Sequence, residues 1–220
     1  LNYIFKLHWG IKLTKSENDK ALKEKYIPIL EKLKIDSIDK NILRPKIIYG
    51  YFPCRKSGND LIIYDPANLT KEIEKFTFPR QNKEENLCLS DYYNEDKMDV
   101  IALQVVTVGN KVDTVCKELN DKGEYDKALY LHGLAVETAE ALAEYSNKLI
   151  IDELGFKKFQ GLRYSFGYPA CPELKDQVKL FKLLNASKIG TKLTSSFQID
   201  PECSTSALIV YHKYAKYFNV

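Results

Sequence analysis

The chain has 220 residues, of which 33 are basic and 30 are acidic, giving a formal net charge of +3. This near balance, without a basic run or patch, excludes a dedicated nucleic-acid binder, and no apolar stretch approaches the ~20 residues that span a bilayer. Four of the basic residues are arginine and 29 are lysine. Because arginine presents a planar fork that suits carboxylates and phosphates, each of the four is a candidate for a specific contact. They are Arg44, Arg55, Arg80 and Arg163.

The cysteine pattern and the first residue indicate where the chain is located and whether it is part of a longer polypeptide. The five cysteines are scattered and form no CxxC pair, so we expect no structural zinc site and a reducing, cytoplasmic location. The chain begins at Leu1, and its only methionine is Met98. We therefore expect one domain over residues 1–220 that is a piece of a longer polypeptide.

The N-terminal part of the chain is predicted to be helical. A helix start is expected at Ser16, and apolar residues then recur at helical spacing over residues 22–33. Pro28 should kink this helix or mark a boundary within it. A short second helix is expected over Ser37–Leu43, before a proline that cannot continue it.

The pattern then changes to strands. An extended run over Lys46–Phe52, turn residues at 57–60 and a second run over Leu61–Tyr64 predict a β-hairpin. Glu72–Phe78 alternates as a third strand. Asp99–Val108 is nearly all apolar, which predicts a central strand buried on both faces.

Two helices are predicted next, over Val112–Asn120 and Tyr125–Leu154, the longer one ending before Gly155. The longer helix should bury an apolar stripe made of Leu131, Leu134, Thr138, Leu142, Tyr145 and Leu149.

A loop over Phe159–Pro172 should lead into a helix over Glu173–Leu184, with Leu174, Val178 and Phe181 on one face. Strands are expected over Thr191–Ile199 and Ala207–His212. Because strands and helices are grouped and do not strictly alternate, we predict an α+β fold with a largely antiparallel sheet.

The most unusual segment is Arg163-Tyr-Ser-Phe-Gly-Tyr-Pro-Ala-Cys-Pro172, directly before the helix expected from Glu173. Gly167 permits a positive φ, the prolines stiffen the loop, and free N–H groups at a helix start attract an anion. One interpretation is a receptor for a small carboxylate or phosphate. The other is a stiff connection in which Arg163 only holds the loop in place.

Two further groups of side chains allow both a binding and a structural interpretation. Glu137, Glu140 and Glu144 share one flank of the long helix and could hold a metal or a ligand cation, or form a solvated face. Aromatic residues near the end of the chain could contact a ligand or pack in the core. Arg80, within a proline-containing turn, is expected to form a salt bridge or to anchor the loop.

Residues 163–172 resemble the signature of the activation domain of cobalamin-dependent methionine synthase: arginine, three variable residues, then Gly-Tyr-Pro-Ala-Cys-Pro. Further blocks resemble the family in the same order, and the details are most similar to its cyanobacterial branch. These blocks are Tyr49–Pro53 with Gly58–Asp60, Phe78–Gln81, Leu87–Asp91, Ala139–Tyr145 and Ala215–Phe218.

The resemblance implies a C-shaped α+β domain that binds S-adenosylmethionine. It further implies a role in the reductive methylation of cob(II)alamin to methylcobalamin, which reactivates the homocysteine-methylating enzyme. Expected partners are the cobalamin-binding domain of the same enzyme and flavodoxin or another reductase, with no nucleic acid and no membrane. No catalytic or metal-binding residue is expected in this domain.

The resemblance also implies ligand-binding residues. Arg163 matches the arginine that binds the methionine carboxylate, and Glu140 matches an acidic residue near the amino end of the ligand. The remaining matches are Gly167, Tyr168 and Ala170 in the signature loop and the aromatic pair Tyr217 and Phe218. Glu137 and Glu144 are expected to remain a solvated flank.

Two other functions are weighed against this one. The first is a docking module that recruits a reductase to a cobalamin domain without a productive ligand site. The second is a methyltransferase that acts by itself, against which the lack of a glycine-rich nucleotide loop after a first strand argues.

Overall fold

The computed structural model describes residues 3–11, 20, 22–83, 85–155 and 161–220. Within these residues the main sheet has six strands in the order β3-β2-β1-β4-β8-β5, and its pairings are antiparallel. The predicted α+β class is confirmed. The strands are β1 (Lys46–Ser57), β2 (Asp60–Asp65), β3 (Asn68–Thr77), β4 (Asp99–Thr107), β5 (Gly161–Tyr164) and β8 (Ser204–Tyr211).

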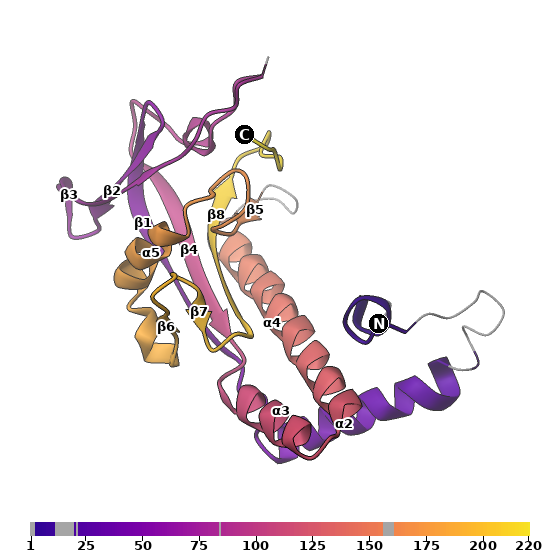
Figure 1. Ribbon diagram of the computed structural model, residues 1–220. Helices are drawn as coiled ribbons and strands as arrows, with labels where there is room; N and C mark the ends of the chain where they lie inside the picture. Colours follow the sequence, from indigo (N-terminus) through magenta and orange to yellow (C-terminus); the bar gives the residue numbers. More distant parts are fainter. Residues whose placement is uncertain (1–2, 12–19, 21, 84, 156–160) are drawn as a thin grey trace.

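Helices stand at both faces and at one end of this sheet. In Figure 1 the sheet lies beside the C-terminal half of α4, and α2 and α3 lie at the N-terminal end of that helix, which gives a curved, C-shaped outline. The helices are α2 (Ile27–Asp39), α3 (Lys111–Asp121), α4 (Tyr125–Glu153) and α5 (Gln177–Leu184). Short π-helical turns are η1 (Ile4–His8) and η2 (Leu22–Tyr26), and 3-10 turns are η3 (Leu89–Tyr92), η4 (Leu174–Asp176) and η5 (Ala186–Ile189).

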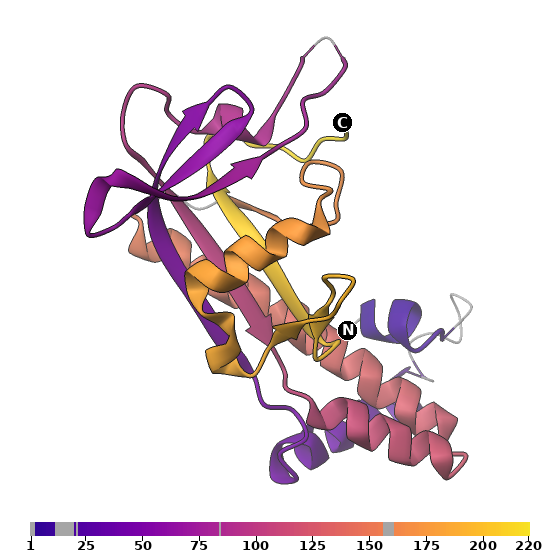
Figure 2. The same ribbon diagram turned by 60° about the vertical axis from the view of Figure 1, so that its left-hand side comes forward.

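Strand β4 is central, as its apolar run predicts. It pairs with β1 from Lys46↔Thr107 to Cys54↔Asp99 and with β8 on its other side. Successive β4 side chains point to opposite faces: Leu103 joins the cluster under α5, and Ala102 joins the cluster under α4. Figure 2 shows α5 in front of the sheet and α4 behind it.

The face of α4 that packs on the sheet consists mainly of small residues. Ala139, Ala143 and Ser146 are buried, whereas Tyr145, in the predicted apolar stripe, is 56% exposed. The stripe prediction is therefore wrong at Tyr145, and Thr138, Leu142 and Leu149 are only half-buried, because small side chains let the helix backbone approach the strands closely.

The helical boundaries differ from the predictions at two places. Pro28 does mark a boundary, since α2 begins at Ile27 after the π turn η2. Residues 37–39 continue α2, so the separate helix predicted over Ser37–Leu43 is wrong; the chain leaves α2 through Asn41, which has φ of +52°. The helix start expected at Ser16 lies outside the described residues.

The segment around α5 is also corrected. The helix begins at Gln177 and not at Glu173, and it buries Leu180 and Leu184, whereas Val178 is 46% exposed. The strand predicted over Thr191–Ile199 is instead a small hairpin of two strands, β6 (Lys192–Leu193) and β7 (Ile199–Asp200). No helix among the described residues is both long and apolar enough to cross a membrane.

The N-terminal turn packs against the first half of α4. The Trp9 indole is 4% exposed, its Nε1 donates to the Tyr130 carbonyl at 3.2 Å, and the two rings lie 4.3 Å apart. His8 Nε2 lies 2.8 Å from Glu137 Oε1. Gly133 makes this approach possible, because a Cβ at that position would lie 2.7 Å from the Cβ of His8.

Replacing Gly133 by alanine is expected to displace the N-terminal turn. The added methyl group would strike His8 and Trp9, although alanine favours the helix itself by up to ~1 kcal/mol. Trp9 is the only tryptophan, so its fluorescence emission should shift to the red and acrylamide should quench it more strongly. The exposed change Lys148→Ala on the same helix is the control, and unchanged emission in Gly133→Ala would contradict the expected displacement.

Candidate functional site

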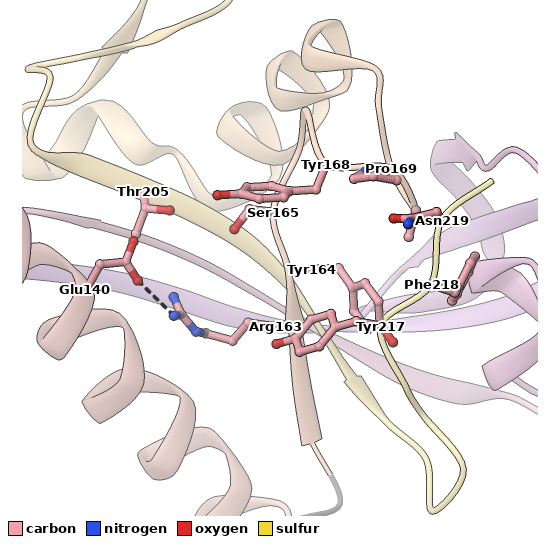
Figure 3. A pocket seen from close by; sticks show the side chains of 11 residues that line it. Glu140, Arg163, Tyr164, Ser165, Tyr168, Pro169, Thr205, Tyr217, Phe218 and Asn219 are labelled. Carbon is pink, nitrogen blue, oxygen red and sulfur yellow. Dashed lines mark hydrogen bonds and ion pairs between the residues drawn. The ribbon is translucent and has the colours of Figure 1, made fainter. Parts of the chain in front are cut away.

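A pocket of about 540 Å³ opens where α4, β5, the loop after β5 and the end of the chain meet. Its size is within the range of small-molecule sites. Figure 3 shows Tyr168 and Ser165 on one side, with Arg163 and Tyr217 opposite them. The lining residues are Glu140, Arg163, Tyr164, Ser165, Tyr168, Pro169, Ala170, Thr205, Tyr217, Phe218 and Asn219.

Arg163 lies on a strand and not in the loop predicted over Phe159–Pro172. Strand β5 pairs with β8 at the sheet edge, with Arg163 opposite Ile209. The first residue of this strand, Gly161, has no room for a side chain, because a Cβ there would come within 2.8 Å of the Tyr211 ring. The strand pairing fixes the backbone of Arg163 and directs its side chain toward α4.

The Arg163 guanidinium is held by two carboxylates of α4. Nε donates to Glu144 Oε1 at 2.9 Å, and Nη2 donates to Glu140 Oε2 at 3.0 Å. Nη2 also lies 2.8 Å from Glu144 Oε1. The arginine side chain is only 14% exposed, whereas the two carboxylate side chains are 55% and 65% exposed. One positive and two negative charges therefore meet at the pocket, with a formal sum of −1.

The two glutamates lie together because they are four residues apart on α4, which places them on one face a single turn apart. Glu144 is exposed but paired with Arg163, so it is more than the solvated flank expected for it. Glu137 contacts His8 at the N-terminal turn and takes no part in the pocket. The spacing of Glu140 and Glu144 was the sequence signal that could have indicated the shared partner.

The signature loop is shaped by hydrogen bonds within itself. Gly167 has φ of +89°, which favours glycine, and its N–H donates to the Cys171 carbonyl at 2.9 Å. Tyr168 and Ala170 line the pocket, whereas Gly167 does not. A Cβ added at Gly167 would lie 3.1 Å from the Leu174 side chain. Gly167 therefore shapes the loop without lining the pocket.

No α-helix starts directly after Pro172, where one of the two interpretations placed an anion site. Residues 174–176 make a 3-10 turn, and α5 begins only at Gln177. The Gln177 side chain already bonds the Phe197 carbonyl and the Ser206 hydroxyl. The positive charge at this pocket therefore comes from the Arg163 side chain and not from a helix N-terminus.

Aromatic side chains form the rest of the pocket. Tyr168 and Tyr217 are each 67% exposed, and the Tyr217 ring lies 5.4 Å from that of the buried Tyr164. Partial desolvation raises the pKa of the Tyr217 phenol, so it stays protonated and neutral at pH 7. Phe218 is partly buried against the main core cluster.

Nucleophilic and metal chemistry have little support in this region. Burial raises the pKa of the Cys171 thiol to about 12, and its Sγ donates to the Ser165 carbonyl at 2.9 Å. A thiol in this state is a poor nucleophile. Among the described residues, no group of histidine, cysteine and acidic side chains is arranged to hold a metal ion.

The structure thus brings six of the seven predicted site residues to one pocket: Glu140, Arg163, Tyr168, Ala170, Tyr217 and Phe218. Sequence reasoning missed Glu144, which bonds Arg163, and it missed Ser165 and Thr205 in the lining. Thr205 comes from β8, far from the signature loop in sequence, and a single threonine in a strand carries no recognisable signal.

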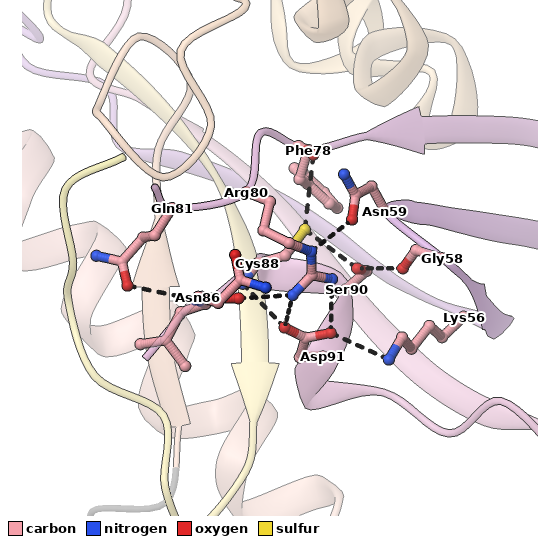
Figure 4. A network of polar contacts seen from close by, with 11 residues as sticks. Lys56, Gly58, Asn59, Phe78, Arg80, Gln81, Asn86, Cys88, Ser90 and Asp91 are labelled. Carbon is pink, nitrogen blue, oxygen red and sulfur yellow. Dashed lines mark hydrogen bonds and ion pairs between the residues drawn. The ribbon is translucent and has the colours of Figure 1, made fainter. Parts of the chain in front are cut away.

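The second predicted arginine forms the expected salt bridge. Arg80 donates to Asp91 through Nη1 at 2.6 Å and Nη2 at 2.9 Å, and its Nε bonds Asn59 Oδ1 at 2.8 Å. Figure 4 shows this network, in which Lys56 also contacts Asp91. Arg80 ties the residue 78–91 loop to the β1–β2 hairpin.

The fold and pocket define an α+β domain with a candidate small-molecule site that combines a paired arginine, its two carboxylate partners and exposed aromatic rings. The chain belongs to the family described as the activation domain of vitamin B12 dependent methionine synthase, which matches residues 12–220. The family resemblance seen in the sequence is confirmed; the cyanobacterial branch and the start of the domain at residue 1 stay predictions.

Two relatives and one solved structure illustrate the similarity. Methionine synthase of Mycobacterium leprae (strain TN) is 34% identical over 201 residues, 79% of this chain and 17% of the relative. Methionine synthase of Mycobacterium tuberculosis (strain ATCC 25618 / H37Rv) is 33% identical over 218 residues, which cover 87% of this chain and 18% of the relative. This chain thus spans less than a fifth of either relative.

The solved structure is a crystal structure of a MetH reactivation domain bound to AdoHcy. It has a TM-score of 0.83 and 26% sequence identity, and the similarity covers 98% of this chain and 74% of that chain. The fold of this chain is therefore that of a domain which, in this neighbour, is bound to AdoHcy.

Proposed function

We propose that the chain binds S-adenosylmethionine in the pocket next to Arg163. The observation that carries this proposal is the meeting of Arg163, Glu140 and the aromatic side chains in one cavity, with Glu144 bonded to the same guanidinium. The neighbour bound to AdoHcy supports the choice of ligand, because AdoHcy is the product left when S-adenosylmethionine gives up its methyl group.

The charges of pocket and ligand are complementary. Arg163, Glu140 and Glu144 sum to −1. S-adenosylmethionine carries a carboxylate, an ammonium and a sulfonium group, which sum to +1. Exposed tyrosine faces add a surface that favours a cation such as the sulfonium. The same glutamates would disfavour a ligand that carries only negative charge, such as free phosphate, because it has no positive group to pair with a displaced glutamate.

Arg163 is proposed to bind the ligand carboxylate. The guanidinium is preorganised by β5 and largely screened from water, and a planar fork matches a carboxylate. The ligand carboxylate would replace a glutamate on Arg163, and the displaced glutamate would then be free to pair with the ligand ammonium. Glu140, which lines the pocket, is the residue proposed for that pairing.

In the whole enzyme we propose that the domain presents the methyl group of S-adenosylmethionine to cobalamin during reductive methylation of cob(II)alamin. Cobalamin, carried by a neighbouring domain, supplies the nucleophile once flavodoxin or another reductase has delivered an electron. The contribution of this chain is to bind and orient the methyl donor. We also propose that the protein is located in the cytoplasm. No residue of this chain is assigned to cobalamin.

Calorimetric titration of the 220-residue chain tests the proposal. S-adenosylmethionine and S-adenosylhomocysteine should each release or absorb heat with a stoichiometry of one and compete with each other. No heat and no competition at millimolar ligand would overturn it. That result would favour the docking module, which would recruit a reductase without a productive ligand site.

Replacing Glu144 by glutamine should change ligand preference as well as affinity. S-adenosylmethionine has a positive sulfur and S-adenosylhomocysteine does not, so losing a carboxylate should weaken the first ligand by about threefold more than the second. Any gain from freeing Arg163 affects both ligands and cancels in the ratio. The measurement is the ratio of the two dissociation constants.

A control for this ratio is Glu118→Gln, which removes an exposed carboxylate from α3, outside the pocket lining. It alters the net charge of the chain by the same amount and should leave the ratio unchanged. An equal ratio in wild type and Glu144→Gln would show that Glu144 does not act on the sulfonium.

A further inference from the structure

One wall of the pocket comes from a segment without regular structure. Residues 217–219 line the pocket, and they follow the end of β8 at Tyr211 in a stretch with no helix or strand. A strand pairing therefore does not hold this wall, in contrast to Arg163 on β5. Other contacts must fix it before a ligand arrives, or the ligand must order it at a cost in affinity.

Buried side chains from two other parts of the fold bond the backbone of this segment. Gln81 Nε2 donates to the Asn219 carbonyl at 2.5 Å, and the Tyr164 hydroxyl donates to the Lys216 carbonyl at 2.7 Å. Gln81 is 6% exposed and Tyr164 is 3% exposed. The two bonds flank Tyr217 and Phe218, the residues between them.

Gln81 is itself firmly held. Its N–H donates to the Leu87 carbonyl at 2.8 Å, and its Oε1 accepts from the Leu87 N–H at 3.3 Å. The next residue back is Arg80, whose guanidinium bonds Asp91 and Asn86. Figure 4 shows Gln81 beside this network, so the donor that reaches Asn219 stands on a loop fixed by charged hydrogen bonds.

Exposed contacts of the same segment are weaker candidates for this role. Lys216 Nζ lies 2.6 Å from Glu85 Oε1, but both side chains are at least half exposed, and such pairs contribute little. Apolar packing helps, since Ala215 and Phe218 contact the main core cluster. Only directional bonds, however, fix the path of the backbone past the pocket.

We infer that Gln81 and Tyr164 are positioning residues that hold the Tyr217–Phe218 wall in its ligand-binding arrangement. This inference rests on the proposed function for its ligand, and it extends that function to Gln81, which does not line the pocket. It also gives a role to Gln81 of the Phe78–Gln81 block, in which the sequence had assigned a structural role to Arg80 alone.

The test compares Gln81→Glu, Gln81→Met and Tyr164→Phe with wild type in the 220-residue chain. Gln81→Glu keeps the acceptor for Leu87 and loses the donor to Asn219; Gln81→Met loses both. Affinity for S-adenosylhomocysteine should fall about fivefold in each, the usual net worth of one hydrogen bond. Amide exchange should accelerate in residues 212–220 of the free protein and stay unchanged in β4.

Gln177→Glu is the matched control. Gln177 is 4% exposed and donates to the Phe197 carbonyl at 2.7 Å, so the same chemical change is made at an equally buried glutamine that holds a different segment. It should lower stability to a similar extent, with affinity within about twofold of wild type and unchanged exchange in residues 212–220.

The possible outcomes distinguish failure of this inference from failure of the proposed function. Wild-type affinity and wild-type exchange in the Gln81 variants would overturn the inference, as would an equal loss of affinity in Gln177→Glu. If the Gln81 variants fail to fold, Tyr164→Phe, which removes a single hydroxyl, decides by the same two measurements. If wild type binds no S-adenosylhomocysteine, the proposed function falls, and exchange in residues 212–220 still decides whether Gln81 holds the segment.

Discussion

Replacing Arg163 by lysine is expected to weaken binding of S-adenosylmethionine by about tenfold or more. Lysine keeps the charge but offers a point contact in place of a planar fork, and one lost charge-assisted bond is worth ~1.4 kcal/mol or above. The shorter reach matters too, since the guanidinium now spans from β5 to two carboxylates on α4. Calorimetry or competition with S-adenosylhomocysteine measures the loss.

The change should leave the fold intact. Glu140 and Glu144 are more than half exposed, and ion pairs with exposed partners contribute roughly 0–1 kcal/mol to stability. Arg44→Lys makes the same substitution at an exposed arginine whose Nε bonds the Asn41 carbonyl, and it should not alter affinity. Unchanged affinity in Arg163→Lys would exclude Arg163 as the carboxylate-binding residue.

Replacing Asp91 by asparagine is expected to cost about 2–3 kcal/mol of stability at neutral pH. Burial tends to raise the pKa of Asp91, but hydrogen bonds from Arg80, Lys56 and the Cys88 N–H outweigh it and lower the pKa to about 2. An unfolded aspartate has a pKa of ~3.9. The difference between these two pKa values corresponds to the free energy by which the folded network favours the ionised carboxylate.

The pH dependence of this loss has a definite sign. Because the folded pKa lies below the unfolded one, the stabilisation is fully present above pH ~4 and disappears as the pH falls toward ~2. The free energies of unfolding of wild type and Asp91→Asn, measured in urea, should therefore differ most near neutral pH and become equal as the pH approaches ~2. A difference that stays constant down to pH ~2 would contradict the assigned role of the carboxylate.

The control for this comparison is Asp121→Asn at the exposed end of α3. It removes an exposed acidic group far from the Arg80 network and should leave the unfolding free energy within ~0.5 kcal/mol of wild type. Ligand affinity supplies a second readout, because Asp91 does not line the pocket and is connected to it through Arg80, Gln81 and Asn219. It should change far less in Asp91→Asn than in Arg163→Lys.

The parts of the fold that the sequence predicted are those where local pattern and burial agree. The β1–β2 hairpin, the central strand β4 and helices α3 and α4 all follow from periodicity and turn residues. The predictions failed where packing decides: Val178 of α5 is apolar but nearly half exposed, and Tyr145 of α4 points outward. A periodic pattern shows that one face is buried but does not show which neighbour covers it.

The site was predicted unevenly for the same reason. Tyr168 and Ala170 lie in a motif that is continuous in the chain, so the sequence could indicate them together. Glu144 and Thr205 come from separate elements, and nothing local shows that Glu144 bonds Arg163 or that Thr205 lines the same pocket. Gly167 was predicted correctly as a special position, but its role is to shape the loop and not to line the pocket.

By itself, the sequence determined the family, the α+β class and the rarity of arginine that directed attention to Arg80 and Arg163. Only the tertiary structure decided what each arginine contacts: Arg80 binds Asp91 in a half-buried network, and Arg163 binds two carboxylates at the edge of a pocket. The physical reason is that a guanidinium fork can satisfy any carboxylate within reach. Which carboxylate is within reach depends on how β5, α4 and the 78–91 loop pack in space.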